Sequence, residues 1–188
     1  MATLCHTQAT ARRKELLEES LFALMKVRSF QEITVKDICA QAQMPRRTFY
    51  HYFESKEDVL NSMVEGLLNQ CLLDGLFAVG LRLEQRRAGF LEIFRFWFSI
   101  NRSKLDVLIQ NGLESILMTT ASRKVRAEKI RLHSAVDIDP KLMEIILLVG
   151  VTDFFTLLFH WSRSGYRESP EEMTEYAIQI LPQAYFKS

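Results

Sequence analysis

Apolar residues recur along the chain with the spacing of one helical face. Leu17, Leu21 and Leu24 lie on a single stripe, and shorter stripes follow it. The helices predicted in this way cover about 10–27, 35–42, 45–52 and a long segment that begins after Ser55. No segment shows the alternation of apolar and polar residues that is typical of a β-strand.

Capping residues mark several helix starts. Two hydroxyl residues stand three positions before a carboxylate, in the pattern of a capping box. These pairs are Thr34 with Asp37 and Ser55 with Asp58. Pro140 and Pro170 follow the cap residues Asp139 and Ser169 and occupy the first helical position, where a missing N–H is harmless.

The second half of the chain also has helical spacing. The predicted helices cover an aromatic-rich segment 90–100, a pair of helices within 105–133 with a break near Asn111–Gly112, the very apolar segment 142–163, and a last helix from Ser169 to near Lys187. We therefore predict an all-α chain with an N-terminal three-helix bundle followed by a C-terminal helical domain.

Composition narrows the class of protein. The 188 residues are 48% hydrophobic and 25% charged, which is typical of a globular protein with a sizeable core. The net charge is only +1, so a surface for nucleic acid has to be local. The cysteines Cys5, Cys39 and Cys71 are widely spaced, and we expect reduced thiols with no disulfide framework, metal site or cofactor.

Localisation is predicted from two segments. The N-terminus lacks the apolar core of a signal peptide, so we expect a cytoplasmic protein. The segment 142–161 is apolar enough to raise the question of a membrane span, but it contains Glu144, Asp153 and His160. Because an unpaired Asp near the middle of a bilayer is costly, we interpret this segment as a soluble helix buried on two sides.

The segment 40–53 is the clearest candidate for a binding site in the sequence. Two short helices flank Ala42-Gln43-Met44-Pro45, and the segment contains two arginines and a histidine but no acidic residue. Phe49 and Phe53 are four apart and can point inward, which leaves Tyr50 and His51 on another face. A local cationic surface at the start of a helix is suited to a phosphate backbone.

This segment resembles the TetR family of bacterial transcriptional regulators. The resemblance rests on Ile33-Thr34-Val35, Asp37-Ile38-Cys39, Ala42 and above all the run from Thr48 to Asp58, and it covers about residues 10–60. It implies a homodimer with a DNA-binding domain over 1–55 and a ligand-binding and dimerisation domain over 56–188, which begins with a linking helix. The DNA contacts that it implies are Thr34, Arg46, Arg47, Thr48, Tyr50, His51 and Lys56.

Two positions depart from the family pattern. Gln43 stands where glycine is usual in the turn, and it is strained if the backbone there has a positive φ. Pro45 stands where a serine cap is usual and cannot accept a side-chain hydrogen bond. Either change can alter the entry angle of the third helix.

The C-terminal domain has two candidate functions. Aromatic residues on two helices are candidates for an apolar ligand pocket, with ordinary core packing as the alternative. These candidates are Phe94, Trp97, Phe98, Phe155 and Phe159. The helices 142–163 and 169–187 are candidates for the dimer interface, because the first is apolar nearly all round.

The leading hypothesis is a ligand-responsive transcriptional repressor. It binds a pseudo-palindromic double-stranded DNA operator as a dimer and responds to an unknown small-molecule effector. The alternative is a related protein that acts through a protein partner, which the departures at Gln43 and Pro45 motivate. An enzyme is not expected, because the sequence has no nucleophile motif, phosphate-binding glycine loop or metal-ligand spacing.

Overall fold

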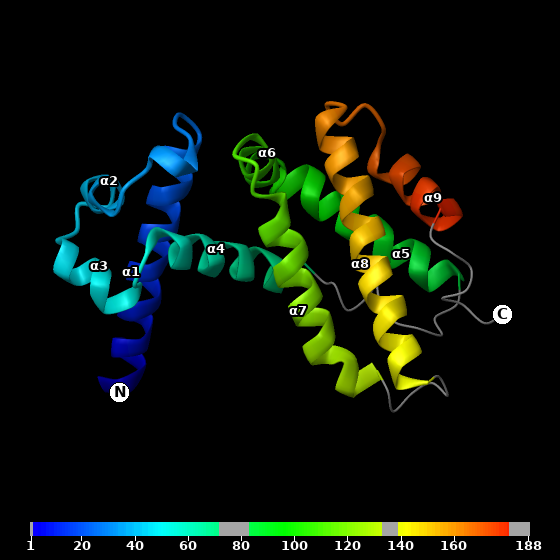
Figure 1. The fold of residues 1–188 in the computed structure, drawn as a ribbon, viewed down its shortest axis with the longest axis horizontal. Coiled ribbons are helices and arrows are strands. Elements are labelled where there is room, and N and C mark those ends of the chain that lie inside the picture. Colours follow the sequence, from blue (N-terminus) through cyan, green and yellow to red (C-terminus); the bar gives the residue numbers. More distant parts are fainter. Residues whose placement is uncertain (1, 72–82, 133–138, 181–188) are drawn as a thin grey trace. The chain divides into compact units, whose positions relative to one another are not determined.

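The structure, a computed structural model, describes residues 2–71, 83–132 and 139–180 (Figure 1). The chain forms two compact units, an N-terminal unit of residues 1–67 and a C-terminal unit of residues 68–188. All of the regular secondary structure in the described residues is helical, as predicted.

The N-terminal unit is built on four helices and a short 3₁₀ turn. These elements are α1 (Ala2–Met25), η1 (Phe30–Glu32), α2 (Val35–Gln41), α3 (Arg46–Tyr52) and α4 (Lys56–Gln70), whose last turn passes into the C-terminal unit. Its core is formed by fully buried apolar side chains from every helix, among them Leu17, Leu21, Ile38, Phe49 and Leu60.

The predicted start of the first helix is wrong. The sequence predicts a start near Thr10, whereas α1 begins at Ala2. Residues 2–9 contain neither glycine nor proline, so nothing in them interrupts a helix that propagates toward the N-terminus. The extension adds two helical turns ahead of the part that packs in the core.

The predicted capping boxes are confirmed. The Thr34 hydroxyl accepts a hydrogen bond from the backbone N–H of Asp37 at 3.3 Å, and the Asp37 carboxylate accepts one from the backbone N–H of Thr34 at 2.8 Å. Ser55 and Asp58 exchange the same two bonds at 3.1 and 3.0 Å. These reciprocal bonds fix where α2 and α4 begin.

The C-terminal unit contains the remaining elements. They are α5 (Leu83–Arg95), a π-helical turn η3 (Phe96–Ile100), α6 (Arg102–Gln110), α7 (Glu114–Leu132), α8 (Pro140–Arg163) and α9 (Pro170–Ile180). α7 packs along α8, and α5 packs along α9 (Figure 1). The predicted break at Asn111–Gly112 is confirmed, with Gly112 at φ +67°. The predicted end near Lys187 lies outside the described residues.

α8 combines a buried face with an uncovered apolar face. Trp161 and Phe155 are fully buried, whereas Leu142, Ile145 and Val149 are 51%, 58% and 41% exposed. By length and composition, Glu144–Arg163 is the one stretch of the described residues that is suited to cross a membrane, a test that core helices of soluble proteins also pass. Only 35% of this stretch is buried within the chain.

Candidate nucleic-acid interface

α2 and α3 form a helix-turn-helix around a tight turn. The backbone N–H of Met44 donates to the Cys39 carbonyl at 2.9 Å, and that of Gln43 donates to the Ala40 carbonyl at 3.2 Å. Gln43 has φ +52°, in the left-handed region, so its backbone has the positive φ that strains a residue with a side chain. Pro45 precedes α3 without a side-chain cap bond, also as expected.

The inward face of α3 anchors this helix in the core. Phe49 is fully buried and Phe53 is 7% exposed, which confirms the prediction that both point inward. Their ring centroids lie 6.1 Å apart. Because these two rings fix the rotation of α3 about its axis, they decide which side chains it presents to the outside.

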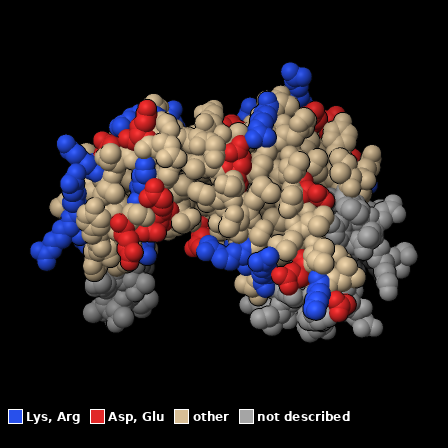
Figure 2. Space-filling view, in the orientation of Figure 1, with Lys and Arg blue, Asp and Glu red and all other residues tan. Residues whose placement is uncertain are grey.

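The outward face of α3 is cationic and rich in hydroxyl groups. Arg46, Arg47 and His51 are exposed, Tyr50 is 59% exposed, and Thr48 is half-buried. α3 itself contains no acidic residue. Figure 2 shows basic side chains gathered at the edge of the N-terminal unit where α2 and α3 lie. Five of the predicted contact residues thus lie together on one exposed helix.

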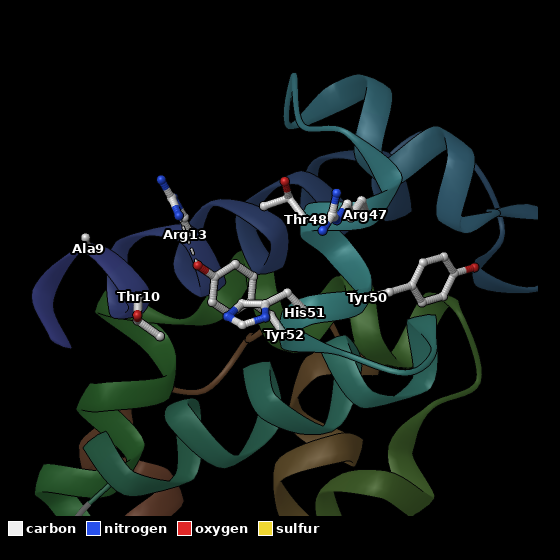
Figure 3. Close-up of a pocket in the computed structure, with 8 residues that line it drawn as sticks. All are labelled: Ala9, Thr10, Arg13, Arg47, Thr48, Tyr50, His51 and Tyr52. Carbon is white, nitrogen blue, oxygen red and sulfur yellow. Dashed lines mark hydrogen bonds between the residues drawn. The ribbon is translucent and has the colours of Figure 1, made fainter. Parts of the chain in front are cut away.

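An open cleft of about 770 Å³ lies beside this face, between α3 and residues 9–13 of α1 (Figure 3). Its lining residues are Ala9, Thr10, Arg13, Arg47, Thr48, Tyr50, His51 and Tyr52. Nη1 of Arg13 donates a hydrogen bond to the Tyr52 hydroxyl at 3.2 Å across the cleft. The lining therefore offers two guanidinium groups, one imidazole and four hydroxyls, and no carboxylate.

Thr34 lies at the start of α2, exposed but committed to its capping box. Its hydroxyl also donates to the Asp37 carboxylate at 2.7 Å. The hydrogen bonds from the Thr34 side chain and backbone hold the pKa of Asp37 below its usual value, and nearby Arg28 adds to this effect. Thr34 is therefore placed by α2 rather than by α3, and its hydroxyl has a structural role as well.

Lys56 differs from the other predicted contacts. Its ammonium donates to the carbonyl oxygens of Phe30, Gln31 and Ile33 at 2.7, 3.1 and 2.8 Å. It also lies 4.6 Å from the centroid of the Phe30 ring. An ammonium has three N–H donors, and all three are used within the protein. We therefore assign Lys56 to holding the start of α4 against η1, and leave it out of the proposed DNA contacts.

Three residues of this cleft, Thr10, Arg13 and Tyr52, were not among the DNA contacts predicted from the sequence. A signal was present, because Arg12-Arg13-Lys14 is a basic run that precedes the first buried stripe of α1. Which of these side chains turns toward α3 depends on the start and rotation of α1.

The candidate ligand residues of the C-terminal unit take part in its aromatic packing. Phe94, Trp97, Phe155 and Phe159 are buried, and Phe98 is half-buried. The Phe98 ring stacks on Trp161, with centroids 5.5 Å apart. Burial raises the pKa of the nearby Cys71 thiol to about 12, an effect that the adjacent Trp97 indole partly offsets. Among the described residues, no group of three His, Cys, Asp or Glu side chains is placed to hold a metal ion.

The sequence of this chain is similar to those of known transcriptional regulators. A family profile described as "Bacterial regulatory proteins, tetR family" matches residues 19–63. An uncharacterized HTH-type transcriptional regulator, YxbF of Bacillus subtilis, is 26% identical over 176 residues, or 90% of this chain. The HTH-type transcriptional regulator EthR of Mycolicibacterium smegmatis is 43% identical over 47 residues, or 25% of the chain. These matches span 45% and 22% of the two relatives, so the chain matches less than half the length of each.

Comparison of structures supports the fold. The dihydroxyacetone kinase operon activator DhaS has a TM-score of 0.57 at 16% identity, over 90% of this chain and 93% of its own. A putative TetR-family transcriptional regulator from Syntrophomonas wolfei has a TM-score of 0.50 at 18% identity, over 93% and 95% of the two chains. At these identities the likeness concerns the fold alone.

Proposed function

We propose that the chain is a transcriptional regulator of the TetR family, whose profile matches residues 19–63, and that it binds double-stranded operator DNA through α3. The observation that carries this proposal is the exposed, acid-free face of α3, held in place by the buried rings of Phe49 and Phe53. Its relatives are named as transcriptional regulators, which favours a regulator over an enzyme.

The dimensions and chemistry of α3 support this function. Seven helical residues span about 10 Å, and a helix fits into the major groove of B-DNA. We assign base-edge contacts to Arg47 and His51 and phosphate contacts to Arg46, Thr48 and Tyr50. Guanidinium groups pair with guanine edges, and hydroxyls donate to phosphate oxygens. Thr34 is left out of the phosphate contacts, because its hydroxyl and its backbone N–H both already donate to the Asp37 carboxylate.

We also propose that the regulator is a homodimer in which α8 and α9 form the interface. Leu142, Ile145 and Val149 recur at helical spacing on the uncovered face of α8. On α9, Tyr176 and Ile180 are 45% and 57% exposed. A second copy of the chain offers the same apolar faces, so a two-fold axis brings like surfaces together. Such a dimer carries two copies of α3, which suits a pseudo-palindromic operator.

The proposal extends to an effector bound by the C-terminal unit, near Phe94, Trp97, Phe98, Phe155 and Phe159. Asn101 is 1% exposed, and its side-chain amide nitrogen has no acceptor among the described residues. A buried donor without a partner costs free energy, which an oxygen atom of a ligand removes. An apolar molecule with one carbonyl or carboxylate fits this description. We further propose repression, since a dimer seated on a promoter blocks access to it.

The direct test is selection of DNA by the purified protein from sheared DNA of its own genome, at two salt concentrations. We expect a small set of fragments, bound less tightly as salt rises, because neutralising phosphates releases counterions. A chain that selects no fragments and shows no dependence on salt would contradict DNA binding. That result would favour the alternative in which the chain acts through a protein partner.

A further inference from the structure

Residues 9–16 of α1 lie outside the core, and three of them, Ala9, Thr10 and Arg13, line a cleft beside α3. Among the described side chains of α1, Leu17 is the first that is buried, and residues 9–16 are exposed or half-buried. A helical segment that packs little of its own surface gains little stability from the fold. Its position alongside the exposed face of α3 is therefore better explained by a partner that covers both.

The cleft between them is built for an anion. Arg13 comes from α1 and Arg47 from α3, and no carboxylate belongs to the lining. Neither arginine has an acidic partner among the interactions of the described residues, whereas the neighbouring Arg12 is paired with Glu15 at 2.9 Å. A guanidinium has five N–H donors, and Arg13, which lines the cleft, uses one of them on Tyr52 (Figure 3).

Tyr52 sets the position of Arg13. Its hydroxyl accepts the hydrogen bond from Nη1 of Arg13 at 3.2 Å, and its ring lies edge-on to His51 with centroids 4.9 Å apart. A long side chain that is held in one orientation before binding loses less conformational entropy when it binds. Tyr52 is thus a positioning residue that aims Arg13 along the cleft.

We propose that this cleft seats a backbone phosphate of the DNA whose bases α3 contacts, with Arg13 as the phosphate ligand and Thr10 as a second donor. The inference rests on the proposed DNA binding and extends the interface beyond the helix-turn-helix to α1. The openness of the cleft suits a continuous strand that passes through it. Arg13 contributes affinity that is independent of sequence, and the base contacts of α3 contribute selectivity.

The test compares Arg13→Ala with Arg12→Ala, a matched loss of one positive charge from the adjacent position. Binding of a selected fragment and of an unrelated duplex is measured between about 50 and 200 mM salt. We expect Arg13→Ala to weaken both roughly tenfold and to reduce the slope of log affinity against log salt by about 0.9 per lost contact. Tyr52→Phe, which keeps the ring and removes the hydroxyl, should produce a smaller loss in the same direction.

Other outcomes overturn the inference in distinguishable ways. If Arg13→Ala and Arg12→Ala have equal slopes and affinities, the cleft does not seat a phosphate of the DNA. If Arg13→Ala changes the preference among operator variants, Arg13 contacts bases instead. If inorganic phosphate binds through Arg13 while binding of DNA is unchanged, the site serves a free anion. A wild-type chain that binds no DNA overturns the proposed function itself.

Discussion

The ammonium nitrogen of Lys56 lies 2.7 Å from the carbonyl oxygen of Phe30 and 4.6 Å from the centroid of its ring. One side chain at the start of α4 therefore holds the connection that leads into α2. Carbonyl groups of a short 3₁₀ turn need donors, and Lys56 donates to three carbonyl oxygens of that connection, those of Phe30, Gln31 and Ile33.

Replacing Lys56 by methionine should destabilise the N-terminal unit. The variant keeps the apolar stem and removes the three donors, so we expect the free energy of unfolding in urea to fall by about 1–3 kcal/mol. Lys36→Met, at an exposed position of α2, should change it by less than about 0.5 kcal/mol. Unchanged stability in Lys56→Met, together with a reduced dependence of DNA binding on salt, would return Lys56 to the DNA contacts.

At Gln43, in the turn between α2 and α3, we predict that a substitution raises the free energy of unfolding, whereas Lys56→Met lowers it. Gln43 has φ +52°, a conformation that glycine adopts without the steric conflict of a Cβ atom. Gln43→Gly should raise the free energy of unfolding by about 0.5–1 kcal/mol, and the β-branched Gln43→Val should lower it. The denaturation midpoints of the two variants give the answer. Equal shifts in one direction would show that backbone strain at this turn is not the controlling factor.

The capping box at α2 predicts a dependence of stability on pH. Hydrogen bonds from Thr34 lower the pKa of Asp37 in the folded chain, so the folded state favours the ionised carboxylate. The resulting stabilisation is fully present above the unfolded pKa, near 4, and is lost as the pH falls through the lower folded pKa. Asp37→Asn should therefore be less stable than wild type at neutral pH, and this difference should shrink in acid.

Urea midpoints measured from about pH 7 down to about pH 3 provide this comparison. Glu32→Gln removes a nearby negative charge without touching the Thr34 hydroxyl, and serves as the control. A difference between wild type and Asp37→Asn that stays constant over the whole range would show that the ionised carboxylate does not stabilise α2.

A charge on the uncovered face of α8 should separate the proposed dimer. Ile145 is 58% exposed in the single chain, and a lysine there would have to be buried without a partner at a two-fold interface. We expect Ile145→Lys to sediment as a folded monomer and to lose most of its affinity for a two-half-site operator. Ser115→Lys, at an exposed position of α7, should leave the mass of the particle unchanged. A wild-type chain that is itself monomeric would contradict the proposed interface.

The sequence predicted the helix-turn-helix better than it predicted the surroundings. Caps at Thr34 and Ser55 and the breaker at Asn111–Gly112 are local signals, so the helices that they bound could be placed. The start of α1 could not, because residues 2–9 contain no signal that begins or interrupts a helix. The spacing of the aromatic residues also gave no indication of the π-helical turn η3.

The roles of side chains could likewise be predicted where they follow from local spacing, but not where they depend on contacts between distant residues. The outward face of α3 follows from the spacing of Phe49 and Phe53, which the sequence displays directly. The use of Lys56 on backbone carbonyls and the pairing of Arg13 with Tyr52 bring together residues that are 23 to 39 positions apart. Such contacts depend on the packing of whole helices, which no local pattern contains.

The central claim is that the exposed face of α3 contacts the bases of DNA. Its most direct test is the ratio of affinities for a selected genomic fragment and an unrelated duplex, in the double variant Arg47→Ala/His51→Ala. His160→Ala/Arg167→Ala removes the same residue types from exposed positions of the C-terminal unit and is the control. We predict that the ratio falls toward one in the α3 variant and stays at the wild-type value in the control. A ratio that is unchanged by the loss of Arg47 and His51 would contradict the account.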